Sequence, residues 1–328
     1  MKTKIILTLF VAILTHKAYS ESWVPDFNIV DQVGNGGKAV LCKDDHGDMT
    51  SIQMLDFFES QRLYELFPEF PSGTPEEKAL GAVNRLVAVD KERMEKYRRE
   101  IQQFESNRYL TGTLSETSDA ESIITPPPNC EIVQVAVQIK PSFPGDRTYY
   151  IDDTLWSKLD EDNKAGLILH EIIFHEALIR GHKNSRATRY LTALISSTKL
   201  NAMVQSDYQD TLRSLKLFTK HWTDQVNNTE WTLFDSFQAN WKVATSVCKE
   251  LANATLPAPQ LIEINKTILL NSTLPSYLID QQIPESWTNY RRPSDGMVGI
   301  AYWTSSNIDI FYRDINTTAE VVCVKISN

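Results

Sequence analysis

After its first residues the sequence lacks any apolar run of the roughly 20 residues that a membrane-spanning helix needs. It also has no excess of basic residues. The chain contains 33 lysines and arginines and 42 aspartates and glutamates, which gives a formal net charge of −9. A dedicated nucleic-acid-binding protein presents a basic face, so nucleic acid is not an expected partner. Hydrophobic residues make up 42% and charged residues 23% of the chain, which indicates a globular protein with a sizeable core.

The one apolar run begins the chain and has the form of a secretory leader. Two lysines precede the apolar segment 5–14, and the small residues Ala18 and Ser20 occupy the −3 and −1 positions of a cleavage site. A buried N-terminal strand is the competing interpretation. We expect residues 1–20 to be a signal peptide, and the mature chain to be exported to the periplasm, the cell surface or the medium. We expect no transmembrane segment in the mature chain.

The chain divides near residue 220, where long amphipathic helices give way to tryptophans, prolines and short β-like runs. We expect an α+β protein with a helix-rich domain over 21–220 and a β-rich domain over 221–328. Two β-hairpins are predicted in the first domain. One has strands 27–33 and 38–42 around the Asn-Gly turn of Gly34 to Gly37, and the other spans 130–151.

Helices are predicted by spacing and by their start and stop residues. The main ones are expected near 51–67, within 75–105, from the acidic cluster at 160–162 to a stop at Gly181, after Asn184-Ser185, and over 203–219. In the second domain, strands are expected over 297–303, 308–312 and 320–326.

The four cysteines lack the C-x-x-C spacing of redox motifs and zinc knuckles. In an exported chain an even number is most simply two disulfides, for which three pairings exist. We expect Cys42–Cys130 and Cys248–Cys323, because each bridge then stays within one domain.

The segment with the strongest candidates for catalysis or metal binding is residues 167–175, Leu-Ile-Leu-His-Glu-Ile-Ile-Phe-His. It invites comparison with the H-E-x-x-H helix of zinc peptidases, in which two histidines four residues apart bind the metal and the glutamate is the general base. Phe174 occupies the position of the second histidine, and His175, five residues after His170, lies about 140° round a regular helix. The candidate site is Glu171 as catalytic base with His170, His175 and His182 as zinc ligands.

Three interpretations of this helix remain open. Its apolar residues cover nearly all sides, which favours a buried structural helix. Glu171 would then need a partner, for which Arg186 or Arg189 is the candidate, and His170 would be hydrogen-bonded. The others are a metal site and a metal-free catalytic role. We favour the structural one.

The first of two resemblances to known groups of proteins covers roughly 30–200. Gly-Asn-Gly-Gly followed by Cys42, then Ala-x-Leu-Ile-Leu-His-Glu, then Gly-His-x-Asn-Ser-x-x-x-Arg at 181–189, resembles a group of uncharacterised exported proteins of predatory bacteria. It implies that His170, Glu171, His182, Ser185 and Arg189 act together, and it implies no activity.

The second resemblance covers about 225–328. Trp241-x-x-Ala-x-x-x-Cys248, Leu-Pro-Ala-Pro-Gln-Leu at 256–261, Tyr-Trp-Thr-Ser-Ser at 302–306 and Cys323-Val-Lys are similar to the C-type-lectin-like C-terminal module of bacterial collagen-like adhesins. The resemblance implies recognition or adhesion, with a surface glycan or protein as the partner. The calcium motifs Glu-Pro-Asn and Trp-Asn-Asp do not occur, so calcium-dependent sugar binding does not carry over. The alternative function is a metal-dependent hydrolase that this module targets.

Overall fold

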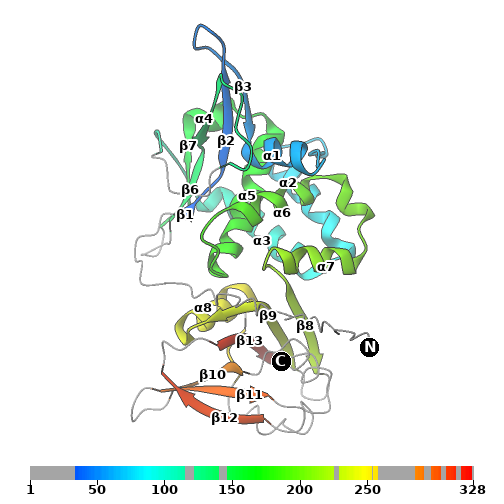
Figure 1. Cartoon of the computed structure of the whole chain (residues 1–328), viewed down its shortest axis with the longest axis vertical. Coiled ribbons are helices and arrows are strands. Elements are labelled where there is room, and N and C mark those ends of the chain that lie inside the picture. The colour runs from blue at the N-terminus through cyan, green and yellow to red at the C-terminus, as the bar shows by residue number, and fades with distance from the viewer. Residues whose placement is uncertain are drawn as a thin grey trace, which may run out of the picture.

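A computed structural model describes residues 34–114, 122–139, 146–224, 229–252, 254–257, 285–291, 297–303, 308–314 and 319–326. The expected signal peptide and the predicted strand 27–33 lie outside these ranges. The described elements form an α+β structure around separate hydrophobic cores. In Figure 1 most of the helices and two small sheets occupy the upper part, and a larger sheet with one helix beside it occupies the lower part.

The upper part, here called the helical part, ends at Phe218. Its helices are α1 (Leu55–Leu63), α2 (Pro75–Val83), η1 (Asn84–Ala88), α3 (Lys91–Asn107), α4 (Asp153–Lys158), α5 (Glu161–Ile179), α6 (Arg186–Ser196), η2 (Thr198–Ala202) and α7 (Gln205–Ser214). Its strands are β1 (Gly34–Asn35), β2 (Lys38–Lys43), β3 (Met49–Met54), β4 (Arg108–Thr111), β5 (Cys130–Gln134), β6 (Ala136–Gln138) and β7 (Tyr149–Asp152). They form one sheet of order β1-β6-β7-β4 and another of order β3-β2-β5.

Helix α5 is the centre of the helical part. The side chain of Asp160 accepts a hydrogen bond from the Asn163 amide and so caps its first turn. Gly181 has a φ of 84°, which ends the helix by the left-handed conformation that glycine adopts freely. Between these residues fourteen residues are buried, so the predicted start, stop and burial of this helix are confirmed.

The predicted hairpin around Gly34 to Gly37 is wrong in the part that the structure describes. Asn35 lies in β1 opposite Val137 of β6, and β2 pairs with β3 and β5. The glycines allow this segment to lie close to the backbone of β6, because a Cβ on Gly36 would lie 2.2 Å from the carbonyl oxygen of Ala136. The other predicted hairpin is confirmed, because β6 and β7 pair antiparallel.

Gly36→Ala should lower the free energy of unfolding by about 1–3 kcal/mol, the range for overpacking. The carbonyl oxygen of Ala136 belongs to the sheet backbone and cannot rotate away from the added methyl group. Gly112→Ala is the matched control, since a Cβ there would meet nothing within 4 Å. Denaturant melts of both variants measure the difference, and equal stabilities would contradict the close approach.

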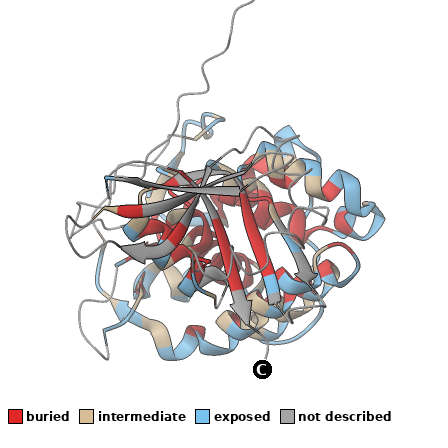
Figure 2. Ribbon diagram, turned by 90° about the horizontal axis from the view of Figure 1, so that it is seen from below, coloured by how far each residue is buried: buried red, intermediate tan, exposed pale blue. Residues whose placement is uncertain are grey.

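The lower part, here called the C-terminal sheet, begins at Thr219. It contains β8 (Thr219–Asp224), β9 (Thr229–Ala239), α8 (Trp241–Ala252), β10 (Glu285–Arg291), β11 (Val298–Trp303), β12 (Ile308–Arg313) and β13 (Ala319–Ile326). The strand order is β12-β11-β10-β13-β9-β8. The predicted strands correspond to β11, β12 and β13, whereas β8, β9 and β10 were not predicted. Figure 2 shows buried residues along several of these strands and through the helices behind them.

Both predicted disulfides are present. Cys42 of β2 is bonded to Cys130 of β5, and Cys248 of α8 is bonded to Cys323 of β13. Two disulfides fit an exported protein, because such bonds persist in oxidising compartments. Among the helices that the structure describes, none has the length and apolar character to cross a membrane.

Candidate functional site

His170 and Asp56 form a buried pair between α5 and α1. Nδ1 of His170 lies 2.8 Å from Oδ1 of Asp56, and both side chains are almost completely buried. Burial alone would lower the pKa of the imidazole, but the charge and hydrogen bond of Asp56, together with the charge of Glu171, outweigh burial and raise that pKa above its ordinary value. The other ring nitrogen, Nε2, is buried and makes no hydrogen bond to any described residue. The hydrogen bond expected for His170 is therefore present, and it joins two helices.

Glu171, the candidate catalytic base, is held by the strands beside α5. Its Oε1 accepts a hydrogen bond from the backbone N–H of Gly37 at 2.6 Å, and its Oε2 accepts one from Nε2 of Gln138 at 2.9 Å. Burial raises the pKa of this carboxyl, against the opposing effects of the His170 charge and of both hydrogen bonds. The side chain is fully buried. Its role in this conformation is to fasten β6 and the Gly36-Gly37 segment to the helix.

The arginine expected beside Glu171 has another partner. Nε of Arg189 donates to Oε2 of Glu59 at 2.8 Å, and its NH1 donates to Oγ of Ser185. Arg186, the other candidate, is exposed at the start of α6. The prediction of a Glu171–arginine pair is wrong in its partner, because a backbone amide and a glutamine satisfy the carboxylate instead.

The remaining two histidines lie apart from this cluster. His175 is partly exposed, with Nδ1 3.8 Å from Oε2 of Glu100 on α3. His182 follows the end of α5, and burial together with the charge of Arg180 lowers its pKa to about 4. Among the described residues, no three histidine, cysteine, aspartate or glutamate side chains group so that they could hold a metal ion. Glu171 thus stays beside its sequence neighbour His170, but the structure does not assemble the three histidines.

Glu176, the most heavily engaged carboxylate of α5, was not predicted from the sequence. Its Oε1 accepts from NH2 of Arg93 at 2.8 Å, and its Oε2 accepts from the Tyr97 hydroxyl at 3.0 Å and from Nζ of Lys96 at 3.2 Å. Arg180 lies 3.7 Å away. Burial alone would raise the pKa of this carboxyl, but the positive charges outweigh burial and hold it well below its ordinary value. A second carboxylate in an apolar helix, four residues before an arginine, was the signal for this site.

Glu171→Gln should lower the free energy of unfolding by only about 1–2 kcal/mol at neutral pH, the scale of one disturbed buried hydrogen bond. The new amide oxygen keeps the bond from Gly37, whereas the new NH2 group faces the NH2 group of Gln138. Because the pKa of Glu171 is raised on folding, its ionisation costs stability as pH rises from the unfolded value through the folded one. The penalty should therefore be larger near pH 4 than at pH 7, which urea melts at both pH values measure. A penalty that grows with pH would contradict this assignment.

One of these contacts, between Gly37 and Glu171, joins two of the segments named in the first resemblance. Gly37 meets Glu171, His170 meets Asp56, and Ser185 supports Arg189 in its pair with Glu59. Together these buried polar contacts, here called the buried network, connect α1 to α5 and α6, and α5 to the strands beside it. Comparison of the chain with models of protein families, with curated proteins and with solved structures finds no match.

Proposed function

We propose that this is an exported recognition protein, which attaches to a surface glycan or protein through its C-terminal part and carries the helical part as a rigid support. The observation that supports this most is the use of the polar residues of α5. His170, Glu171 and Glu176 each hold another structural element in place. Their side chains are buried, so their chemistry serves the fold in this conformation.

The C-terminal sheet has the features of a stable platform. Helix α8 packs on it through Val243, Ala244 and Val247, and the Cys248–Cys323 bridge fixes α8 to β13. The indole N–H of Trp241 donates to the carbonyl oxygen of Thr288 in β10 at 2.8 Å. Recognition residues commonly lie on loops that such a scaffold positions. The resemblance of this part to a C-type-lectin-like module, which implies recognition or adhesion, is part of the same proposal.

The test is a binding measurement on the mature chain, from Glu21 onward. It is applied to a glycan array and to isolated bacterial envelopes, and hydrogen–deuterium exchange then maps the bound region. We expect saturable binding with new protection within 219–326. Protection confined to the helical part, or no binding to either surface, would overturn the proposal.

Matched cysteine variants assign the binding to one part of the chain. In the chain-entropy model a bridge across 75 residues contributes about 4 kcal/mol to stability. The pair Cys248→Ser/Cys323→Ser should weaken binding, whereas Cys42→Ser/Cys130→Ser, which removes the other bridge, should leave affinity within about twofold. The metal content of the purified protein is measured in parallel. Stoichiometric zinc that is lost in His170→Ala would instead support the hydrolase alternative with Glu171 as general base.

A further inference from the structure

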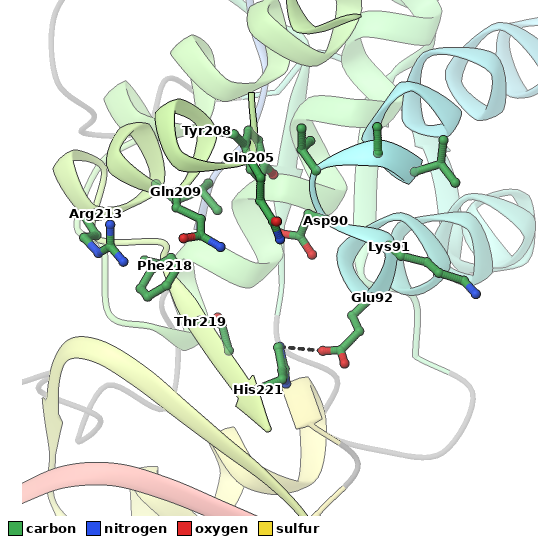
Figure 3. A pocket seen from close by; sticks show the side chains of 14 residues that line it. Asp90, Lys91, Glu92, Gln205, Tyr208, Gln209, Arg213, Phe218, Thr219 and His221 are labelled. Carbon is green, nitrogen blue, oxygen red and sulfur yellow. Dashed lines mark ion pairs between the residues drawn. The ribbon is translucent and has the colours of Figure 1, made fainter. Parts of the chain in front are cut away.

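A cavity of about 520 Å³ lies where the helical part meets the C-terminal sheet. We call it the seam pocket. Figure 3 shows it between the start of α3, the helix α7 and the first residues of β8. Its volume falls within the roughly 300–1,000 Å³ of small-molecule sites. The lining residues are Val87 to Glu92, Gln205, Tyr208, Gln209, Leu212, Arg213, Phe218, Thr219 and His221.

The walls of the seam pocket are held by the network around Glu176. Arg93, which pairs with Glu176, also donates to the carbonyl oxygen of Leu217 at 2.6 Å and to the Tyr208 hydroxyl at 3.4 Å. Arg180 donates to the carbonyl oxygen of Phe218 at 2.7 Å. These bonds fix the chain on both sides of the pocket, so the cavity is formed before any ligand arrives.

The charged side chains of the pocket are already compensated. Asp90 pairs with Arg93, Arg213 pairs with Asp210, and Nζ of Lys91 lies 3.9 Å from Oε1 of Glu95. Nε2 of His221 lies 2.6 Å from Oε2 of Glu92. The dashed line in Figure 3 marks the contact between His221 and Glu92. A pocket whose carboxylates and cations are paired in this way offers little net charge to select an ion.

Two amides remain for hydrogen bonding to a ligand. Gln205 and Gln209 lie one turn apart on α7, and Figure 3 shows both side chains directed into the space between α7 and α3. Neither amide makes a hydrogen bond within the part of the chain that the structure describes. Each amide offers an acceptor oxygen and two N–H donors. A ligand hydroxyl group can therefore either donate a hydrogen bond to the amide or accept one from it. Leu212 and Phe218 lie beside them but are almost fully buried, so they offer a ligand little surface.

We propose that the seam pocket binds a neutral saccharide of one or two rings. Neighbouring hydroxyls would bond to the Gln205 and Gln209 amides. An anion would need an unpaired cation, so the charge balance favours the neutral ligand. The site is separate from the recognition surface proposed above, and either proposal can fail without the other.

The test uses the mature full-length chain and calorimetric titration with glucose, galactose, N-acetylglucosamine, maltose, lactose and chitobiose. We expect at least one sugar to bind. Gln205→Ala/Gln209→Ala should weaken it by about tenfold or more, which corresponds to 1.4 kcal/mol and to the loss of two modest hydrogen bonds. Gln102→Ala/Gln103→Ala removes two exposed amides from α3, away from the lining residues, and should leave affinity unchanged.

A second variant and two further probes keep the outcome decisive. Gln209→Trp should fill the cavity and abolish sugar binding, while a thermal melt checks that the fold persists. No binding of any of the six sugars at 10-millimolar scale, or binding that both pocket variants leave intact, would overturn the proposal. Binding of inorganic phosphate or of a neutral glycine–serine peptide without any sugar would also overturn it.

Discussion

Glu176→Gln should destabilise the protein by about 3–5 kcal/mol, the scale for removing one member of a buried charge pair. The substitution leaves the guanidinium of Arg93 buried and removes the main partner that compensates it. Because Arg93 also holds the carbonyl oxygen of Leu217, the loss should spread to the start of β8. Chemical denaturation measures the loss, and Glu105→Gln on the exposed end of α3 is the control, expected to stay within about 0.5 kcal/mol.

The same variant should change the response to acid. The pKa of Glu176 is lowered on folding, so its contribution to stability is present above its unfolded value and disappears as pH falls through the folded value. Wild type should therefore lose stability below about pH 4.5 more steeply than Glu176→Gln does. A wild-type and a variant curve that stay parallel from pH 7 to pH 3 would show that Glu176 is not the coupled group.

Much of the helical part could be predicted because its signals are local. Asp160 and Gly181 mark the ends of α5, and the spacing of apolar residues within 75–105 predicted a helix or helix pair, found as α2 and α3. The strands β8 and β9 were missed although they are consecutive and pair locally, with Asp224 opposite Thr229. Only the pairing of β9 with β13 joins residues far apart in the chain. The glycines at 36–37 were assigned to a turn because a turn and a close backbone approach use the same residue type.

The buried network could be predicted in its location but not in its pairing. Glu171 stood out as a carboxylate in an apolar helix, yet its partner is the backbone N–H of Gly37, a group that every residue except proline carries. Asp56 and Glu59 lie one turn apart on α1, and nothing in their spacing distinguishes them from an acidic pair that faces solvent. Only the packing of α1 against α5 and α6 turns them toward His170 and Arg189.

Arg189→Met should be the second large destabilisation, again about 3–5 kcal/mol, because it leaves the Glu59 carboxylate buried without its cation. Arg186→Met, three residues earlier on the exposed side of α6, should change stability by less than about 0.5 kcal/mol.

The double variant Glu59→Gln/Arg189→Met separates the charge from the packing. A glutamine at position 59 still accepts the hydrogen bond from the Ile123 amide but carries no charge, so the double variant should be more stable than Arg189→Met alone. Urea melts of the wild type, the single variants and the double variant give the coupling energy between positions 59 and 189. For residues that share one network this energy is about 0.5–3 kcal/mol. A coupling near zero would mean that Arg189 stabilises α6 through packing alone, and the network would then end at His170 and Glu171.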